Sequence, residues 1–239
     1  MPIPHIEFLP IAVEHDQDQL IWDEALVQLS ARGELAPCLR IWQVAHPMVV
    51  MGYGNRAATE VNLEACQRLN IPVRRRSSGG GAVYLDAGCL NFSLVLPVSS
   101  HPSLASVTTT NDWIMHHQRA WLTDLIGQPV TREGDTDLAI RGLKCSGNAQ
   151  RRLAHAVLFQ GTLLFQADLS HLSQVLRTPS RQPAWRGERS HDAFVVNLGL
   201  DPSRVRESLL RHWCQSNHEL QRISIPNDLW HTAADRLKG

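Results

Sequence analysis

The chain has 239 residues, 43% of them hydrophobic, and its 23 basic and 23 acidic residues leave no net charge. This length is enough to bury a full core as one domain over residues 1–239, and the balanced charge excludes a general nucleic-acid binder. The sequence has neither a signal-peptide pattern nor a run of about 18 apolar residues, and its five cysteines form no Cys-x-x-Cys motif, so we expect a cytoplasmic protein that binds no membrane.

The hydrophobic pattern predicts an α+β fold. In chain order we expect a helix near 18–29, strands near 39–44 and 48–51, a helix to about residue 70, strands at 72–75, 80–85 and 90–96, a helix to about residue 126, a β-hairpin around 141–142, a strand at 155–165, and helices from 201–202 and over 227–237. Thr59 and Thr110 are the expected N-caps of the second and third helices, and Pro202 follows Asp201 at the start of the fourth.

A segment rich in arginine and glycine begins at the end of the third expected strand. Arg74 to Arg76 precede Ser77 and Ser78, and Gly79, Gly80 and Gly81 lead into the apolar run that starts at Ala82. Glycines let backbone amides converge on an anion, and an arginine supplies a planar fork for phosphate or carboxylate. The spacing matches neither a P-loop nor a Gly-x-Gly-x-x-Gly helix start. We therefore expect either an anion site on a strand-turn-strand element or an ordinary basic hairpin loop.

The second informative segment is a predicted β-hairpin that turns at Arg141-Gly142. Strand alternation places Lys144 and Ser146 on one face of its second strand, and Leu143, Cys145 and Gly147 on the other. A lysine in an apolar strand is costly unless an anion meets it.

Four blocks containing these segments follow one another in a recognisable order. They are Arg75 to Val83 (Arg-Arg-Ser-Ser-Gly-Gly-Gly-Ala-Val), Gly88 to Ser93 (Gly-x-Leu-Asn-Phe-Ser), Asp137-Leu138 with Gly142 to Gln150 (Gly-x-Lys-x-Ser-Gly-x-Ala-Gln), and Gly161 to Leu164 (Gly-Thr-Leu-Leu). In this order they resemble the lipoate-protein ligases, within the wider group of lipoate and biotin ligases and octanoyltransferases, from about Gln19 to Leu198. The resemblance implies a catalytic domain of the biotin/lipoate-protein ligase type, with central mixed and antiparallel β-sheets flanked by helices and with C-terminal helices over about 201–237.

The resemblance also implies a reaction. Such a ligase activates lipoate (or octanoate) with ATP and Mg²⁺ to an acyl-AMP, and transfers the acyl group to a lysine of a lipoyl-domain acceptor of the 2-oxoacid dehydrogenase E2 or glycine-cleavage H type. Lys144 would be the catalytic residue, contacting the acyl carbonyl and the α-phosphate. The implied substrate- and adenylate-binding residues are Arg76, Ser78, Gly79, Gly80, Gly81, Ala82, Asp137, Ser146, Gly147, Asn148, Gly161 and Thr162. Asp137 is also the candidate Mg²⁺ ligand, although no metal site is assigned.

Two alternatives to a lipoate-protein ligase stay open. An octanoyl or lipoyl transferase would use a cysteine and no ATP, but no cysteine stands at Val157-Leu158 or over 132–137, where such a nucleophile is expected; Cys89 and Cys145 remain the candidates. A non-catalytic acyl-binding protein would have little reason to keep Lys144 in its motif. Only some 40 residues follow Leu198, too few for the additional C-terminal domain of many lipoate ligases. The chain would therefore make the adenylate unaided, use a separate accessory subunit, or only transfer preformed lipoyl-AMP, and the sequence does not decide among these. A biotin ligase is disfavoured, because its Gly-Arg-Gly-Arg loop is absent.

The segment from Arg177 to Asp192 carries four arginines together with Pro179, Pro183 and Gly187, which disfavour regular structure. A loop of this length is uncommon unless it is functional or disordered. The resemblance implies that this region folds over the adenylate, so we expect it to be mobile without ligand and to order over the acyl-adenylate; the alternative is a solvated surface loop.

Overall fold

The structure is a computed structural model that describes residues 3–179, 181–214 and 223–238. It confirms the α+β class. The larger sheet contains β1 (Glu7–Phe8), β2 (Cys38–Trp42), β6 (Cys89–Pro97), β7 (Thr131–Glu133), β8 (Asp137–Ile140), β9 (Leu143–Arg152) and β10 (Ala156–Leu164), in the order β1-β2-β6-β10-β9-β8-β7. The smaller sheet contains β3 (Met48–Met51), β4 (Val73–Arg75) and β5 (Val83–Leu85), in the order β4-β3-β5.

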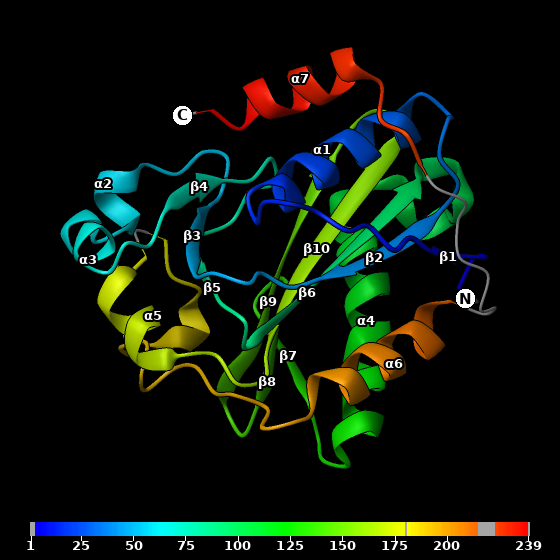
Figure 1. The fold of residues 1–239 in the computed structure, drawn as a ribbon. Helices are drawn as coiled ribbons and strands as arrows, with labels where there is room; N and C mark the ends of the chain where they lie inside the picture. Colours follow the sequence, from blue (N-terminus) through cyan, green and yellow to red (C-terminus); the bar gives the residue numbers. More distant parts are fainter. Residues whose placement is uncertain (1–2, 180, 215–222, 239) are drawn as a thin grey trace.

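Helices lie on both faces of the larger sheet and around the smaller one (Figure 1). They are α1 (Asp18–Ala31), α2 (Ala57–Glu60), α3 (Leu63–Arg68), α4 (Val107–Ile126), α5 (Leu169–Val175), α6 (Pro202–Trp213) and α7 (Asn227–Arg236), with short 3₁₀ turns at Val98–Ser100, Pro102–Ala105 and Ala184–Arg186. Among the described residues, no helix combines the length and the apolar character that crossing a membrane requires.

Strand β6 shows how the two faces are built. Leu94 and Leu96 pack into the core beneath α4 and α6, whereas Val95 between them packs with Leu26 of α1 on the other side. Because helices cover both faces, the residues of β6 from Cys89 to Leu96 are all buried, and they are apolar except for Asn91 and Ser93. Hydrophobic clusters thus lie on each face of the larger sheet, and a third hydrophobic cluster lies around the smaller sheet, where Val49 and Val50 are 0% and 1% exposed.

The C-terminal helix α7 packs on α1. Trp22 and Trp230 meet edge to face with ring centroids 5.6 Å apart, and Leu229 and Ala233 are fully buried. The guanidinium of Arg236 lies 4.9 Å from the ring centroid of Tyr53. These contacts join the C-terminal helix to the core, which favours the proposed single domain.

The predicted β-hairpin is confirmed, with its turn at Arg141 (φ 52°) and Gly142 (φ 76°). Positive φ at both central residues is typical of a type I′ turn, which suits the twist of the strands it joins. The predicted start of α6 is also confirmed: the Asp201 side chain accepts a hydrogen bond from the Arg204 amide, and Val205, Leu209 and Trp213 are fully buried.

Two predicted caps are wrong. The second predicted helix is interrupted at Val61, which bridges to Leu176, and Asn62 caps α3 by accepting a hydrogen bond from the Ala65 amide. Helix α4 begins one turn before Thr110, because Ser106 and Thr109 form a reciprocal capping box. The start was not evident from the sequence, because each of the three consecutive threonines at 108–110 is a possible N-cap.

Candidate active site

The glycine-rich loop connects β4 to β5 and is packed against a second loop at 52–55. A Cβ on Gly52 would stand 2.0 Å from the Gly80 carbonyl oxygen, so the two backbones meet where only glycine fits. The amide of Tyr53 donates to the Ser78 carbonyl at 2.9 Å, and Gly80 has a φ of 88°. Gly79, Gly80 and Gly81 are all exposed and Ala82 is half-buried, which leaves one edge of the loop open to a ligand.

Two of the three arginines before the loop fix its surroundings. The Nε of Arg74 donates to the Gln17 side chain at 3.0 Å. One Nη of Arg75 donates to the carbonyls of Gly52, Tyr53 and Asn55 at 3.1, 2.8 and 2.9 Å, and so holds the neighbouring loop in place.

Arg76 is buried inside the glycine loop. Its Nε donates to Ser78 Oγ at 3.0 Å, and its two Nη atoms donate to the carbonyls of Val50 (3.2 Å), Gly79 (2.5 Å) and Gly81 (2.9 Å). Within the described part of the chain no carboxylate pairs with it, and burial lowers the pKa of its guanidinium to about 10. A buried cation without a counter-charge is costly, and a bound anion beside the loop would offset that cost.

The lysine strand departs from simple alternation. Leu138 and Ala139 are adjacent on β8, and their partners on β9 are Ser146 and Lys144 respectively. Cys145, between these two partners, is therefore an extra residue in the ladder. Such a β-bulge turns the side chains that follow it. Cys145 and Ser146 are both buried, at 0% and 1% exposure, which corrects the prediction that Lys144 and Ser146 share a face.

Lys144 instead shares a face with Gly147. A Cβ on Gly147 would lie 2.9 Å from Lys144 Nζ and 3.0 Å from its Cε, so the lysine side chain lies over the glycine. Asp137 holds the Nζ from the neighbouring strand at 2.7 Å. The lysine side chain is 27% exposed and the aspartate side chain 15%, so this ion pair is open to a ligand on one side.

Two rows of paired residues cross the sheet on this face and connect the lysine with the glycine loop. The residues that lie directly opposite one another are Arg40, Ser93, Gln160 and Ala149 in the first row, and Trp42, Asn91, Thr162 and Gly147 in the second. Directly opposite residues project on the same side of a sheet. The first row ends under the glycine loop, since a Cβ on Gly80 would lie 3.7 Å from the Cβ of Ala149, and the second ends under Lys144.

The lysine and the glycine loop therefore lie over neighbouring positions of β9. Gly147 and Ala149 are two residues apart, which corresponds to about 7 Å along a strand. In the second row, Thr162 Oγ1 donates to Asn91 Oδ1 at 2.7 Å. Gln160, Thr162, Gly147 and Ala149 are half-buried although they belong to central strands. This part of the sheet face is thus less covered than the strands around it.

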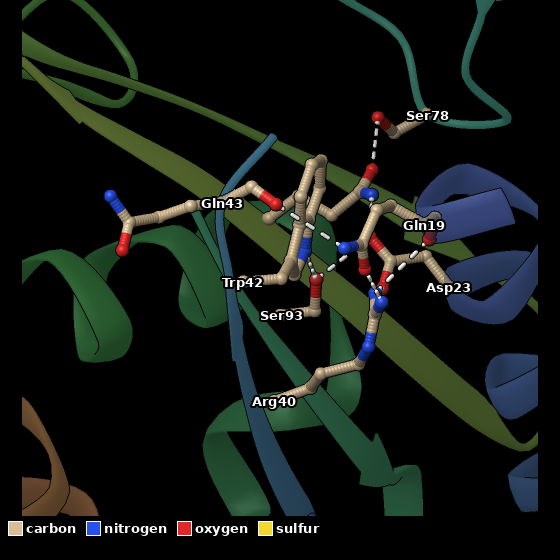
Figure 2. A network of polar contacts seen from close by, with 8 residues as sticks. Gln19, Asp23, Arg40, Trp42, Gln43, Ser78 and Ser93 are labelled. Carbon is tan, nitrogen blue, oxygen red and sulfur yellow. Dashed lines mark hydrogen bonds and ion pairs between the residues drawn. The ribbon is translucent and has the colours of Figure 1, made fainter. Parts of the chain in front are cut away.

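The three polar residues of the first row, Arg40, Ser93 and Gln160, belong to a polar network (Figure 2). Asp23 of α1 accepts hydrogen bonds from Arg40 Nη1 (2.8 Å), Ser93 Oγ (2.8 Å) and Gln160 Nε2 (2.6 Å). Gln160 Oε1 accepts a bond from Ser78 Oγ at 2.7 Å, which connects the network to the glycine loop. Burial lowers the pKa of the Arg40 guanidinium, while the neighbouring Asp23 favours its charged form.

The segment after Arg181 packs on the lysine hairpin. Arg189 donates to the Gly142 carbonyl at 2.9 Å, the Lys144 amide donates to the Phe194 carbonyl at 2.8 Å, and the Val196 amide donates to the Lys144 carbonyl at 2.9 Å. The guanidinium of Arg186 stands 4.6 Å from the centroid of the Phe194 ring. The expected ordering of this segment over a ligand stays a prediction, and position 180 lies outside the described residues.

His191 in the same segment faces positive charge. Burial, and then the positive charges of Arg186 and Lys144, lower its pKa to about 4, so the imidazole is neutral at neutral pH. It is a further polar group beside the lysine, and no sequence motif singled it out.

Not all predicted residues share the face of Lys144. Ser146 and Asn148 project to the opposite side of β9, where the Asn148 side-chain amide donates to the Thr136 carbonyl at 2.6 Å. Gly161 is required for packing on that side, because a Cβ added to it would lie 2.1 Å from the Phe92 ring and 2.2 Å from Asn148 Oδ1.

Asp23, Arg40 and Gln160 were not among the residues predicted from sequence. One signal was present: Arg40 stands between Leu39 and Ile41 in an expected strand, where a buried arginine needs an acidic partner.

The five cysteines are poor nucleophiles in this structure. Cys38, Cys66, Cys89 and Cys145 are buried, and burial is the largest cause that raises the pKa of every one of the five thiols, to about 12 for Cys145 and about 11 for Cys214. Cys89, one of the two candidate nucleophiles, packs in the core around the smaller sheet and is fully buried. Residues 3–179, 181–214 and 223–238 contain no group of three or more His, Cys, Asp and Glu side chains that could hold a metal.

Comparison with known proteins reveals the family. The family model described as the lipoyl protein ligase A/B catalytic domain matches residues 16–206. A protein named "Probable lipoate-protein ligase A" from Mycoplasma pneumoniae is 29% identical over 201 residues, which cover 82% of this chain and 58% of that protein. Lipoate-protein ligase A subunit 1 of Thermoplasma acidophilum is 30% identical over 212 residues, covering 83% and 79%. An octanoyltransferase LipM of Kyrpidia tusciae is also similar, at 28% over 221 residues, covering 81% and 80%.

The chain spans only about half to three-fifths of the length of the first of these relatives and of two similar ones. Among solved structures, a lipoate-protein ligase A bound with ATP superimposes with a TM-score of 0.77 at 24% identity, covering 97% of this chain and 93% of that one. This likeness confirms the fold that the sequence predicted.

Proposed function

We propose, from the premise that the chain belongs to the lipoyl protein ligase A/B catalytic-domain family, that it is an ATP-dependent lipoate-protein ligase. It would convert lipoate, or octanoate, and ATP to an acyl-AMP and then acylate a lysine of a lipoyl-domain protein. The observation that carries the proposal is that Lys144 Nζ and the glycine loop lie over neighbouring positions on one face of β9.

In the first step a carboxylate oxygen of lipoate attacks the α-phosphorus of ATP, the bond to the bridging oxygen breaks, and pyrophosphate leaves. Negative charge grows on the phosphoryl oxygens. Lys144, which Asp137 holds at 2.7 Å, would meet that charge, and a cation fixed in advance stabilises such a transition state. The buried charge of Arg76 and the exposed amides of Gly79 to Gly81 would hold the anionic end of the acyl-AMP.

In the second step the neutral amine of the acceptor lysine attacks the acyl carbonyl, loses a proton, and displaces AMP. Charge now grows on the carbonyl oxygen and on the leaving phosphate. The same Lys144 Nζ would stabilise both, which explains why one lysine is expected to serve the two steps. The neutral His191 in the adjacent segment adds no positive charge against the incoming amine at neutral pH.

The described residues form no ready-made cage for Mg²⁺, but Mg²⁺ commonly needs only one or two carboxylates together with nucleotide phosphates. Asp137 is the carboxylate beside Lys144 that would supply such a ligand. When bound, the ion would neutralise phosphate charge.

An octanoyltransferase is the second candidate, because a similar protein from Kyrpidia tusciae carries that name. The state of the cysteines argues against it. A transferase of this kind needs a reactive thiolate, and burial raises the pKa of all five thiols.

The proposed partner is a lipoyl-domain protein of the E2 or H type. A similar Thermoplasma acidophilum protein is named a subunit, and a solved structure from the same organism is described as a bipartite lipoate protein ligase and its E2 lipoyl domain. By analogy, the proposal includes a separate accessory subunit that assists this chain in adenylation.

The test is acylation of a purified lipoyl domain followed by intact mass. One reaction holds lipoate, ATP and Mg²⁺, and the other holds octanoyl-carrier protein without ATP. A mass gain only in the first supports the ligase, and a gain only in the second replaces it by the transferase. If neither reaction gives a gain, synthetic lipoyl-AMP distinguishes a chain that transfers but needs help with adenylation from a non-catalytic binder.

A further inference from the structure

The glycine loop is connected to a buried ion pair through one side-chain amide. We propose that Gln160 is a positioning residue that fixes the glycine loop against the acyl substrate by transmitting the geometry of the Asp23–Arg40 pair. This inference rests on the proposed ligase function and deepens it, because it identifies what sets the position of the loop.

The fixed end of the connection is the ion pair. Arg40 and Asp23 are 0% and 1% exposed, and Arg40 Nη1 lies 2.8 Å from Asp23 Oδ1. Arg40 also donates to the backbone carbonyl and the side chain of Gln19, and Asp23 accepts from Ser93 at 2.8 Å. Because separating the partners would leave two charges buried and uncompensated, we expect the pair to keep its geometry.

Gln160 is the bridge. Its Nε2 donates to Asp23 Oδ2 at 2.6 Å, and its Oε1 accepts from Ser78 Oγ at 2.7 Å. The amide nitrogen donates and the amide oxygen accepts, so the two hydrogen bonds also fix the orientation of the amide. A side chain that can only accept, or only donate, would lose one of the two bonds.

The other end of the connection is the glycine loop. Ser78 is 1% exposed and also accepts from Arg76 Nε at 3.0 Å. Arg76 in turn holds the carbonyls of Gly79 and Gly81. The loop carbonyls are thus linked to Asp23 through Gln160, Ser78 and Arg76 in turn, and a change at Gln160 alters the loop glycines without touching them.

The variant Gln160→Glu distinguishes a positioning role from a role in packing alone, because glutamate has the same shape as glutamine but a different hydrogen-bonding capacity once it is ionised. Next to Asp23 at 2.6 Å the new carboxyl holds a proton at low pH, since two adjacent carboxylates resist double ionisation. The protonated acid keeps both hydrogen bonds, with its O–H donated to Asp23 and its carbonyl accepting from Ser78. Once ionised, it loses the bond to Asp23 and is repelled by it.

The experiment measures the KM for lipoate and kcat of wild type and Gln160→Glu from about pH 6 to about pH 8.5, a range that brackets a raised carboxyl pKa. We expect the ratio of the variant's KM to the wild-type KM to be near one at the acid end and to rise to about tenfold or more at the alkaline end, since small misplacements of a binding group are costly. The KM for ATP should change less than the KM for lipoate.

Two serine variants provide the matched comparison. Ser78→Ala removes the hydroxyl that joins Gln160 to the loop, and Ser208→Ala removes one that accepts from Trp121 Nε1 at 3.0 Å, away from the site. Ser78→Ala should raise the lipoate KM at every pH, and Ser208→Ala should leave it unchanged.

A pH-independent ratio for Gln160→Glu, or equal KM values for Ser78→Ala and Ser208→Ala, overturns the positioning role. If Gln160→Glu folds poorly, the calorimetric affinity of Gln160→Met for lipoate, expected to fall about tenfold, decides the same question, and an unchanged affinity overturns the proposal. Failure of wild type to acylate a lipoyl domain even from synthetic lipoyl-AMP overturns the proposed ligase function instead, so the two failures are distinguishable.

Discussion

Lys144 and Gly147 share one face of β9 although three positions separate them, because a bulge at Cys145 shifts the alternation between them. The lysine side chain consequently runs back along its own strand, and its Nζ lies close to where a larger residue at 147 would place its Cβ. Bulges are frequent beside active sites because they redirect a single side chain without breaking the sheet.

Lys144→Ala should severely impair both adenylation and transfer while the fold stays intact. The side chain is 27% exposed and its ammonium group pairs with Asp137, which is itself open to solvent on one side, so its loss costs little packing. We expect kcat to fall by about 10²–10³-fold, the effect of removing one preorganised charge-stabilising group. Pyrophosphate release measures the first step and acylation from synthetic lipoyl-AMP the second. Full turnover by a folded variant would contradict the assigned role.

Gly147→Ala should impair activity more than stability. The new methyl group would come within 2.9 Å of Lys144 Nζ, and the flexible end of the lysine would move aside at little cost to the fold. We expect kcat to drop by about tenfold or more because the cation is displaced. Gly54→Ala is the control, since nothing lies within 4 Å of its Cβ position. Equal activities of the two variants would show that the position of the lysine is not critical.

Gly161→Ala should instead destabilise the protein. Its Cβ would stand 2.1 Å from the Phe92 ring in the core, where the neighbours cannot move away freely. Overpacking of this kind costs about 1–3 kcal/mol or more. Urea unfolding monitored by tryptophan fluorescence gives the free energy directly. The same Gly54→Ala variant should unfold like wild type. If Gly161→Ala has the urea midpoint of wild type, a methyl group at position 161 does not crowd Phe92.

The protein should lose stability as the pH falls from about 6.5 to about 4. Burial lowers the pKa of both His191 and His212 to about 4 in the folded chain, whereas the ordinary value is 6.5. Between these values the unfolded chain binds protons that the folded chain does not, so acid favours unfolding.

His212→Gln tests this away from the active site. We expect its Tm to fall less on acidification than that of wild type, by roughly 2–4 °C, the effect of about 1 kcal/mol in a domain of this size after allowance for solvent screening. The exposed His5 provides the control His5→Gln, which should follow wild type. If the Tm of all three proteins falls equally as the pH is lowered, His212 does not cause the loss of stability in acid.

Most of the fold was predictable because its signals are local. Apolar periodicity located α1, β3, β6 and α6, and Arg141-Gly142 identified the hairpin turn, since few other pairs accept positive φ at both positions. The glycine loop and Lys144 were likewise recognised from contiguous motifs. The second and third helices began at the wrong residues because adjacent polar side chains compete to cap a helix and sequence alone does not rank them.

The connection between the site residues was not predictable. Alternation cannot reveal where a ladder skips a residue, so the bulge at Cys145 made the predicted face of Ser146 wrong. The network depends on Asp23 meeting Gln160, 137 positions away, and neither residue carries a motif. Their proximity follows from strand order in the sheet, which no local pattern contains.

The contact between Gly52 and Gly80 has an evolutionary and a thermodynamic consequence. Position 52 cannot gain a side chain unless the glycine loop retreats, and a side chain at position 80 would need a φ of 88° and would meet Arg76 Nη2 at 2.9 Å, so both positions are restricted to glycine although they come from different turns. A loop that its neighbour already confines has little conformational freedom left to lose. An anion bound there would therefore incur a small ordering entropy, and more of its contact energy would appear as affinity.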